Sequence, residues 1–288
     1  MVASENRFFE IERVKQPEHF LEQPGLVERL EAALSTRVGA QHAVAVNSGT
    51  AALHASMYAV GIGPGDEVLV LDPCYDSYQP AIELAGGTAV HVPLRAGSFA
   101  VDWPAVEAKL GPRSRMIMIN SPHNPTGATL DDADMRTLEA LAERYNLLVC
   151  SDEVYEHLSY DGLPHRSVLQ YPGLRERSFA HFSFGKTFSV TGWKTGYCVA
   201  PPALTAELRK VHQFVAFVAV TPVQQALAHF LAADPYYPAS LADFYQRKRD
   251  LFCDALQQSR FSFTPSAGTY FQVLDYSEIS QAADTGLC

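Results

Sequence analysis

The sequence lacks the features that mark several large classes of protein. Its 288 residues hold no apolar run near the ~18 to 20 residues that a membrane-spanning helix needs. The first fifteen residues mix acidic and basic side chains where a secretion signal needs an apolar stretch. The longest basic run is residues 247–249 and the net charge is −10, which argues against nucleic acid as the main partner. We therefore expect a cytoplasmic protein, away from the membrane, that binds small molecules.

Cysteine is also scarce, and its spacing carries no motif. The five cysteines stand at positions 74, 150, 198, 253 and 288, without a Cys-x-x-Cys pair. Neither they nor the ten scattered histidines show the close spacing that metal ligands need. We predict ordinary thiols and no metal site.

What the sequence does contain is a regular alternation of strand and helix patterns. Apolar, β-rich runs are typical of buried strands and lie at 42–47, 67–72, 88–94, 115–120, 147–153, 179–184 and 196–201. Helical patterns follow several of these runs, beginning near Thr50, Ser77 and Asp131. After Pro201 the pattern turns helical and closes with a strand-like piece at 262–277. The alternation predicts an α/β fold with a largely parallel sheet, covered by helices on both faces.

Four short motifs stand at the carboxyl ends of these expected strands, where open α/β sheets bind ligands. NSGTAAL opens a helix, and the backbone N–H groups near Gly49 and Thr50 can hold an anion there. NSPHNPTG fixes the direction of the Asn124 side chain between two prolines. SDEVYEHL places Asp152 at the end of an apolar run, where an ionised carboxylate needs a cationic partner. Lys186 follows the next run.

Each motif alone also has an ordinary explanation. The four explanations are a capped turn, a proline-rich loop, an exposed aspartate and a lysine that reaches solvent. Taken together, the motifs match the needs of one cofactor, pyridoxal 5′-phosphate. This cofactor requires a phosphate cradle, a carboxylate for its ring cation, a donor for its phenolic oxygen and a lysine for an imine.

With DPCYDSY and SFGKTFSVTGWKTGYCVAP, the four motifs resemble those of the fold-type I pyridoxal-phosphate aminotransferases of class I/II. The resemblance covers about residues 47–277 and is strongest to the methionine, aromatic and kynurenine aminotransferase branch. The front end is shorter than in that branch and resembles the sugar aminotransferases of the same fold type.

The resemblance implies a role for each of nine residues. Lys186 would form the internal aldimine and move a proton between the substrate's α-carbon and the cofactor. Asp152 would keep the pyridine nitrogen protonated, which makes the ring withdraw electrons. The cofactor's other contacts would be Asn124 and Tyr155 at the phenolic oxygen, Tyr75 on the ring, and Gly49, Thr50, Ser183 and Lys194 at the phosphate. Tyr155 would join Lys186 and Asp152 as a catalytic residue.

The resemblance also implies the architecture. We expect an N-terminal arm and helix at residues 1–38, and an aspartate-aminotransferase-like large domain of three layers, α/β/α, at 39–235. Residues 236–288 should begin a small α+β C-terminal domain that is incomplete in this sequence. The arginine with which that domain normally clamps the substrate carboxylate has no match here, so activity should be impaired. The family further implies a homodimer.

The leading hypothesis is transamination between an L-amino acid, methionine, aromatic or kynurenine-like, and a 2-oxo acid. Two alternatives stay open: a C–S β-lyase that uses the same aldimine, and a truncated cofactor-binding protein with little turnover. Product analysis separates the two enzymes, because a transaminase yields a 2-oxo acid with aminated cofactor and the lyase yields pyruvate and ammonia. Cofactor absorbance without any half-reaction would indicate the binding protein.

Overall fold

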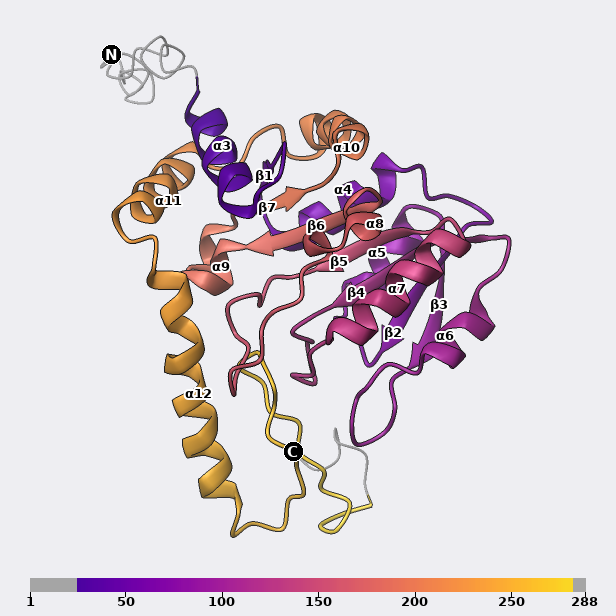
Figure 1. The fold of residues 1–288 in the computed structure, drawn as a ribbon, viewed down its shortest axis with the longest axis vertical. Coiled ribbons are helices and arrows are strands. Elements are labelled where there is room, and N and C mark those ends of the chain that lie inside the picture. Colours follow the sequence, from indigo (N-terminus) through magenta and orange to yellow (C-terminus); the bar gives the residue numbers. More distant parts are fainter. Residues whose placement is uncertain (1–24, 282–288) are drawn as a thin grey trace, which may run out of the picture.

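A seven-stranded sheet forms the centre of the computed structural model, which describes residues 25–281 (Figure 1). Its strand order is β1-β7-β6-β5-β4-β2-β3. The strands are β1 (Val44–Val46), β2 (Glu67–Asp72), β3 (Thr88–Pro93), β4 (Ser114–Asn120), β5 (Leu148–Asp152), β6 (Ser178–Ser183) and β7 (Gly196–Val199). Strands β2 to β6 pair in parallel, whereas β7 runs antiparallel to β1 and β6. The prediction of a mostly parallel sheet is confirmed.

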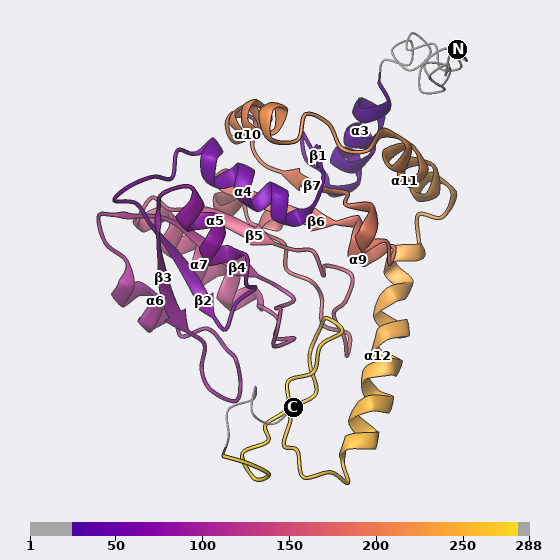
Figure 2. The same ribbon diagram turned by 180° about the vertical axis from the view of Figure 1, so that it is seen from behind.

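Helices cover both faces of this sheet (Figures 1 and 2). One face carries α4 (Gly49–Ala59), α5 (Tyr78–Leu84) and α10 (Pro202–Val215). The other carries α3 (Leu26–Val38), α6 (Trp103–Lys109), α7 (Asp132–Arg144), α8 (Pro172–Arg175) and α11 (Thr221–Ala233). The result is the expected three-layer α/β/α arrangement.

Shorter elements and one long helix complete the described chain. These are η1 (Val168–Gln170), α9 (Phe184–Thr187), η2 (Thr191–Trp193) and α12 (Tyr237–Leu256). Helix α12 extends away from the sheet, and the C-terminal segment returns beside the loops at the sheet's edge (Figure 1). Within residues 25–281, no helix is both long and apolar enough to cross a bilayer. Most of the predicted N-terminal arm, and residues 282–288 of the predicted small domain, lie outside the described residues.

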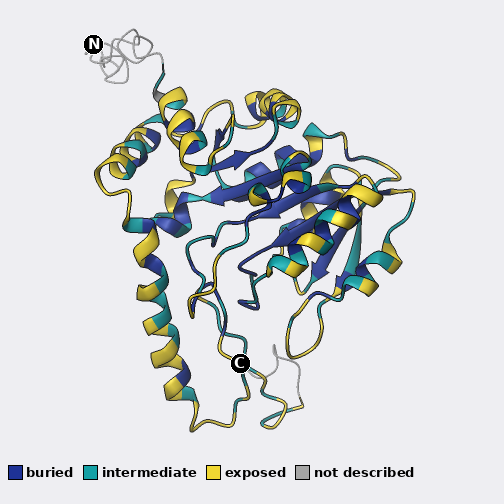
Figure 3. Ribbon diagram, in the orientation of Figure 1, coloured by how far each residue is buried: buried dark blue, intermediate teal, exposed yellow. Residues whose placement is uncertain are grey.

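The strand side chains alternate between two apolar clusters, one on each face of the sheet. In β2, Leu69 and Leu71 belong to the cluster under α7, whereas Val68 and Val70 belong to the cluster under α4. The other central strands repeat this pattern, and the sheet is buried throughout its middle (Figure 3). Because helices cover both faces, both sets of side chains are apolar, and the strands appear in the sequence as continuous apolar runs.

Helix α7 begins where the sequence predicted, directly after Asp131. The Asp131 carboxylate accepts a hydrogen bond from the Asp134 N–H at 2.9 Å, and the Asp134 carboxylate accepts one from the Asp131 N–H at 3.1 Å. This reciprocal capping satisfies two N–H groups that would otherwise lack partners, and it places negative charge at the positive end of α7.

The final apolar piece, predicted as a strand, forms none in the part of the chain that the structure describes. It makes only two isolated bridges, between Ser262 and Asp275 and between Gly268 and Ser159. Between these bridges lies Pro265, which has no N–H to donate and so interrupts a ladder of hydrogen bonds. The segment is held by a few specific contacts instead of a sheet.

The close approach of β7 to β6 gives a first prediction. A Cβ on Gly196 would lie 2.4 Å from the carbonyl oxygen of Phe182. We expect Gly196→Ala to lower the free energy of unfolding by about 1–3 kcal/mol, the usual cost of overpacking. Denaturant titration measures this loss. Gly111→Ala is the matched control, since a Cβ there meets no heavy atom within 4 Å. Equal stability of the two variants would contradict the prediction.

Candidate active site

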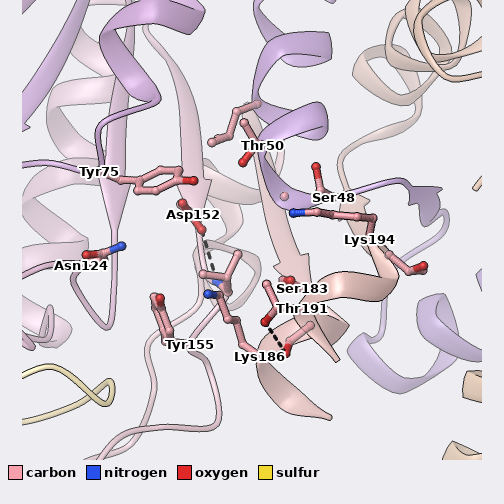
Figure 4. Close-up of a pocket in the computed structure, with 15 residues that line it drawn as sticks. Ser48, Thr50, Tyr75, Asn124, Asp152, Tyr155, Ser183, Lys186, Thr191 and Lys194 are labelled. Carbon is pink, nitrogen blue, oxygen red and sulfur yellow. Dashed lines mark hydrogen bonds between the residues drawn. The ribbon is translucent and has the colours of Figure 1, made fainter. Parts of the chain in front are cut away.

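The ends of β5 and β6 and the beginning of α4 surround one pocket (Figure 4). The structure brings all nine residues singled out in the sequence to its walls: Gly49, Thr50, Tyr75, Asn124, Asp152, Tyr155, Ser183, Lys186 and Lys194. Further lining residues, which lie within the same sequence motifs but were not singled out, are Ser48, Leu53, Val154, Gly185, Thr191 and Thr195. Side chains that are far apart in the sequence meet here because parallel strands end at the same edge of a sheet.

The beginning of α4 offers an anion site. The Ser48 side chain caps the helix, and its oxygen accepts a hydrogen bond from the Ala51 N–H at 3.0 Å. The first N–H groups of any helix have no partner within it, so those of Gly49 and Thr50 are available to a ligand. The Lys194 side chain extends toward the same end of α4 (Figure 4). Backbone donors and an ammonium group together suit a phosphate.

Two glycines allow close packing beside this anion site. A Cβ on Gly49 would lie 3.2 Å from Val154 Cγ1, and one on Gly185 would lie 2.9 Å from Thr191 Cα. The hydroxyl of Thr191 in turn donates to the Gly185 carbonyl at 3.1 Å. Gly49 therefore lets the start of α4 lie close to the turn after β5, and Gly185 lets α9 lie close to the loop before β7; a side chain at either position would require its neighbour to shift.

Asp152 supplies a buried carboxylate on the opposite side of the pocket. The residue ends β5 and is only 6% exposed. Its oxygens accept hydrogen bonds from the Tyr78 hydroxyl at 2.7 Å and from the Val154 N–H at 3.3 Å. Burial nevertheless raises the pKa of Asp152 to about 6, although these hydrogen bonds and the charge of Lys186 act to lower it. Within residues 25–281, the carboxylate forms no salt bridge that would offset its burial.

Tyr78 is a member of the site that sequence reasoning missed. It begins α5, is almost fully buried, and meets Tyr75 edge to face with ring centroids 5.7 Å apart. Burial and the neighbouring Asp152 carboxylate hold its pKa well above the ordinary value. The phenol therefore stays protonated and donates a hydrogen bond to Asp152. The signal was present, because Tyr78 stands in the same DPCYDSY motif that drew attention to Tyr75.

Asn124 is placed by a side-chain link between neighbouring strands. Asn120, the last residue of β4, donates from its amide to the Asp152 carbonyl at 2.8 Å. Its side-chain oxygen accepts a hydrogen bond from the Asn124 N–H at 2.6 Å. The loop that carries Asn124 is therefore fastened to the end of β5, and Asn124 lines the pocket on the side of Tyr75 (Figure 4).

Lys186 enters the pocket from α9, directly after β6. Its Nζ donates a hydrogen bond to the hydroxyl of Tyr270 at 2.9 Å. The same nitrogen lies 5.5 Å from the ring centroid of Tyr155 and 5.6 Å from that of Tyr270. Burial, with Tyr270 beside it, raises the pKa of Tyr155, which therefore remains a neutral phenol. Tyr270, too, had not been singled out in the sequence.

The pocket combines three chemical functions in one space. It offers an amine for covalent attachment at Lys186, a carboxylate for a cation at Asp152 and a cradle for an anion at the start of α4. Among the described residues, the cations in its lining are Lys186 and Lys194, and no arginine lines it.

Comparisons with known proteins agree with this arrangement. The family model "Aminotransferase class I and II" matches residues 10–285. Methionine aminotransferase of Escherichia coli is 46% identical over 239 residues, which make up 83% of this chain and 62% of that protein. Human kynurenine–oxoglutarate transaminase 3 is 34% identical, over 75% of this chain and 51% of its own length. The chain thus spans less than two thirds of the length of these curated relatives.

Solved structures show the same likeness in three dimensions. A methionine aminotransferase of Escherichia coli superposes with a TM-score of 0.86 at 42% identity, covering 92% of this chain and 70% of that one. N-succinyldiaminopimelate aminotransferase from Mycobacterium tuberculosis gives a TM-score of 0.85 at 33% identity, with the same coverage. Since the family match extends over nearly the whole sequence, the chain belongs to the class I and II aminotransferases.

Proposed function

We propose that this chain binds pyridoxal 5′-phosphate and catalyses transamination between an L-amino acid and a 2-oxo acid. The observation that carries the proposal is the placement of Lys186 and Asp152 in one pocket with the open N-terminus of α4. A buried carboxylate, an amine and an anion cradle are together what this cofactor needs. Methionine and kynurenine aminotransferases among the relatives favour a methionine, aromatic or kynurenine-like amino donor.

The residues present fit the cofactor group by group. Gly49, Thr50, Ser183 and Lys194 would bind the phosphate, and Asp152 would face the ring nitrogen. Asn124 and Tyr155 would hold the phenolic oxygen, and Tyr75 would cover the ring. When bound, the cofactor supplies an electron-poor ring that accepts the electron pair released at the substrate's α-carbon.

The protein side of the mechanism is the control of two protons. Asp152 holds one proton at the ring nitrogen, because a positive partner opposite a buried carboxylate favours the charged pair over the neutral one. Tyr78 and the Val154 N–H keep that carboxylate oriented. Lys186 carries the other proton to and from the substrate's α-carbon, acting as general base and then as general acid. Tyr155, a neutral phenol beside Lys186, remains a hydrogen-bond donor throughout.

We also propose that the protein is a homodimer, as the family resemblance implies. The end of α10 and its connection to α11 expose five large apolar side chains: Phe214, Val215, Phe217, Val218 and Val220. Contiguous exposed apolar surface of more than a few hundred Å² marks a partner surface or an aggregation liability. A second copy of this chain would cover it. A cytoplasmic location, expected from the sequence, stays a prediction.

Lys186 gives the direct test of the proposed chemistry. Borohydride reduction of the cofactor-loaded protein should link the cofactor to the peptide that contains Lys186, and mass spectrometry identifies that peptide. Lys186→Ala should show no such link and no transamination, because the proposed role of Lys194 is at the phosphate and not at the aldehyde. Lys194→Ala is the matched control: it should keep the covalent link but bind the cofactor more weakly, since it removes the ammonium group from the phosphate site and leaves Lys186 in place. An adduct at another lysine would refute the assignment.

Asp152 gives a prediction about stability and pH in the cofactor-free protein. Its folded pKa is about 6 against 3.8 for an unperturbed aspartate, so the folded state binds the proton more tightly. The stability contributed by this proton is complete below pH 3.8 and is lost as the pH rises through 6. Asp152→Asn should therefore be more stable than the wild type at pH 8, by roughly 1–3 kcal/mol, with the difference vanishing near pH 4.

Unfolding curves at both pH values measure this difference, and the exposed Asp76→Asn is the control. With saturating cofactor, the wild type should become more stable than Asp152→Asn. The wild-type carboxylate then gains a cationic partner, whereas the amide of the variant cannot hold a proton on the ring. Asp152→Asn should also transaminate far more slowly. A variant that is less stable than the wild type at pH 8 would show that the carboxylate is already paired.

The exposed apolar run at the end of α10 and in its connection to α11 gives a prediction about assembly. Replacing both Phe214 and Phe217 with glutamate should convert the dimer to monomer, because two buried charges would oppose association. Sedimentation velocity measures the mass. Leu84→Glu, at an exposed apolar residue on α5, is the control and should leave the dimer intact. A wild-type protein that sediments as a monomer would refute the proposed homodimer.

A further inference from the structure

The C-terminal segment is fastened to the loop that follows β5. The Tyr160 N–H donates to the Ala267 carbonyl and the Thr269 N–H donates to the Leu158 carbonyl, each at 2.9 Å. The Tyr160 hydroxyl also donates to the carbonyl of Thr269. These bonds surround the isolated bridge between Ser159 and Gly268. A segment that comes after α12 in the chain is thus held against the loop that begins at Asp152.

Two glycines make this contact close. A Cβ on Gly268 would lie 2.6 Å from the Leu158 carbonyl oxygen and 2.7 Å from Pro122 Cβ. A Cβ on Gly127 would lie 2.4 Å from Ser266 Cβ, and Gly127 has a φ of +72° that disfavours other residues. The segment therefore also packs against the loop that carries Asn124, and its position relative to the pocket is defined on two sides.

This anchoring delivers Tyr270 to Lys186. Tyr270 meets Tyr155 edge to face at 5.5 Å between ring centroids, and it meets Phe271 at 4.9 Å and Tyr245 of α12 at 6.0 Å. With its ring held by three aromatic neighbours, its hydroxyl lies 2.9 Å from Lys186 Nζ. None of the sequence motifs pointed to this contact.

We propose that Tyr270 is a positioning residue for Lys186, a step that rests on the proposed function. A lysine side chain has four rotatable bonds, and fixing it costs up to about 2 kcal/mol of free energy in lost rotamer entropy. The Tyr270 hydroxyl accepts a hydrogen bond from Nζ, and the rings of Tyr155 and Tyr270 flank the same nitrogen. Together they hold the amine in the pocket whenever it is not bonded to the cofactor.

The positioned amine then performs a balanced step. Lys186 Nζ, as a neutral amine, forms a bond to the aldehyde carbon of the cofactor. The aldehyde oxygen leaves as water with both protons of the amine, and no electrons are gained or lost. A lysine that is already oriented toward the pocket reaches the aldehyde carbon more often than a lysine with a freely rotating side chain. The contact with Tyr270 should therefore accelerate the formation of the covalent bond to the cofactor, here called capture.

The test uses the cofactor-free full chain and the variant Tyr270→Phe, which keeps the ring and removes only the hydroxyl. Stopped-flow absorbance after mixing with pyridoxal 5′-phosphate gives the rate of covalent capture, and borohydride trapping assigns it to Lys186. Loss of one hydrogen bond should slow capture about five- to tenfold. Tyr245→Phe is the matched control, because it removes a hydroxyl from the same aromatic group without touching Lys186, and its rate should stay within about twofold of the wild type.

Each outcome decides the matter. A wild type that captures no cofactor overturns the proposed function itself. A wild type that captures cofactor while Tyr270→Phe does so equally fast overturns the positioning role alone. Equal slowing of both variants, with a shared loss of stability in unfolding curves, means that the aromatic group matters only for packing, and this also overturns it. In turnover, the positioning role requires Tyr270→Phe to lower kcat while KM for the amino acid is unchanged.

Discussion

The burial of one carboxylate at the end of a strand is the constraint on which this site depends. Asp152 lies at the carboxyl end of β5 with a phenol and a backbone amide as its partners, and neither is charged. Such a group costs stability until a cation arrives. The rest of the fold makes this cost tolerable: two apolar clusters hold the sheet on both faces, and the Asn120 side chain joins the end of β4 to that of β5.

The same geometry explains why the other groups gather around Asp152. Parallel strands end at one edge, so the turns after β2, β4, β5 and β6 deliver Tyr75, Asn124, Tyr155 and Lys186 to neighbouring positions. The start of α4 adds the anion site without any charged side chain of its own, and Lys194 supplies the charge. Carboxylate and cradle stand on opposite sides of the pocket, which suits a ligand that is cationic at one end and anionic at the other.

The sequence allowed prediction of the sheet and of nine pocket residues, for a physical reason. Buried strands are continuous apolar runs, and short motifs after four of these runs pointed to five pocket residues: Gly49, Thr50, Asn124, Asp152 and Lys186. The family resemblance implied the other four: Tyr75, Tyr155, Ser183 and Lys194. The roles of Tyr78 and Tyr270 were not predicted. Each residue belongs to the site through its contact with another side chain, Asp152 or Lys186, and a sequence pattern does not show such contacts. The predicted final strand was wrong because a strand also needs a partner, which alternation alone does not provide.

The contact between Tyr270 and Lys186 divides the site into two parts with different origins. The anion cradle, Asp152 and Asn124 all belong to the α/β sheet and the loops at its edge. The phenol that holds the lysine comes from beyond α12 and is fixed by two backbone hydrogen bonds and the fit of Gly268. Displacing that segment would remove the hydrogen bond to Lys186 Nζ, whereas the beginning of α4 and the Asp152 carboxylate would keep their own contacts within the α/β layers. The position of the anion cradle and of Asp152 therefore depends on the stability of the sheet. The position of the Lys186 amine depends in addition on the contacts of the C-terminal segment.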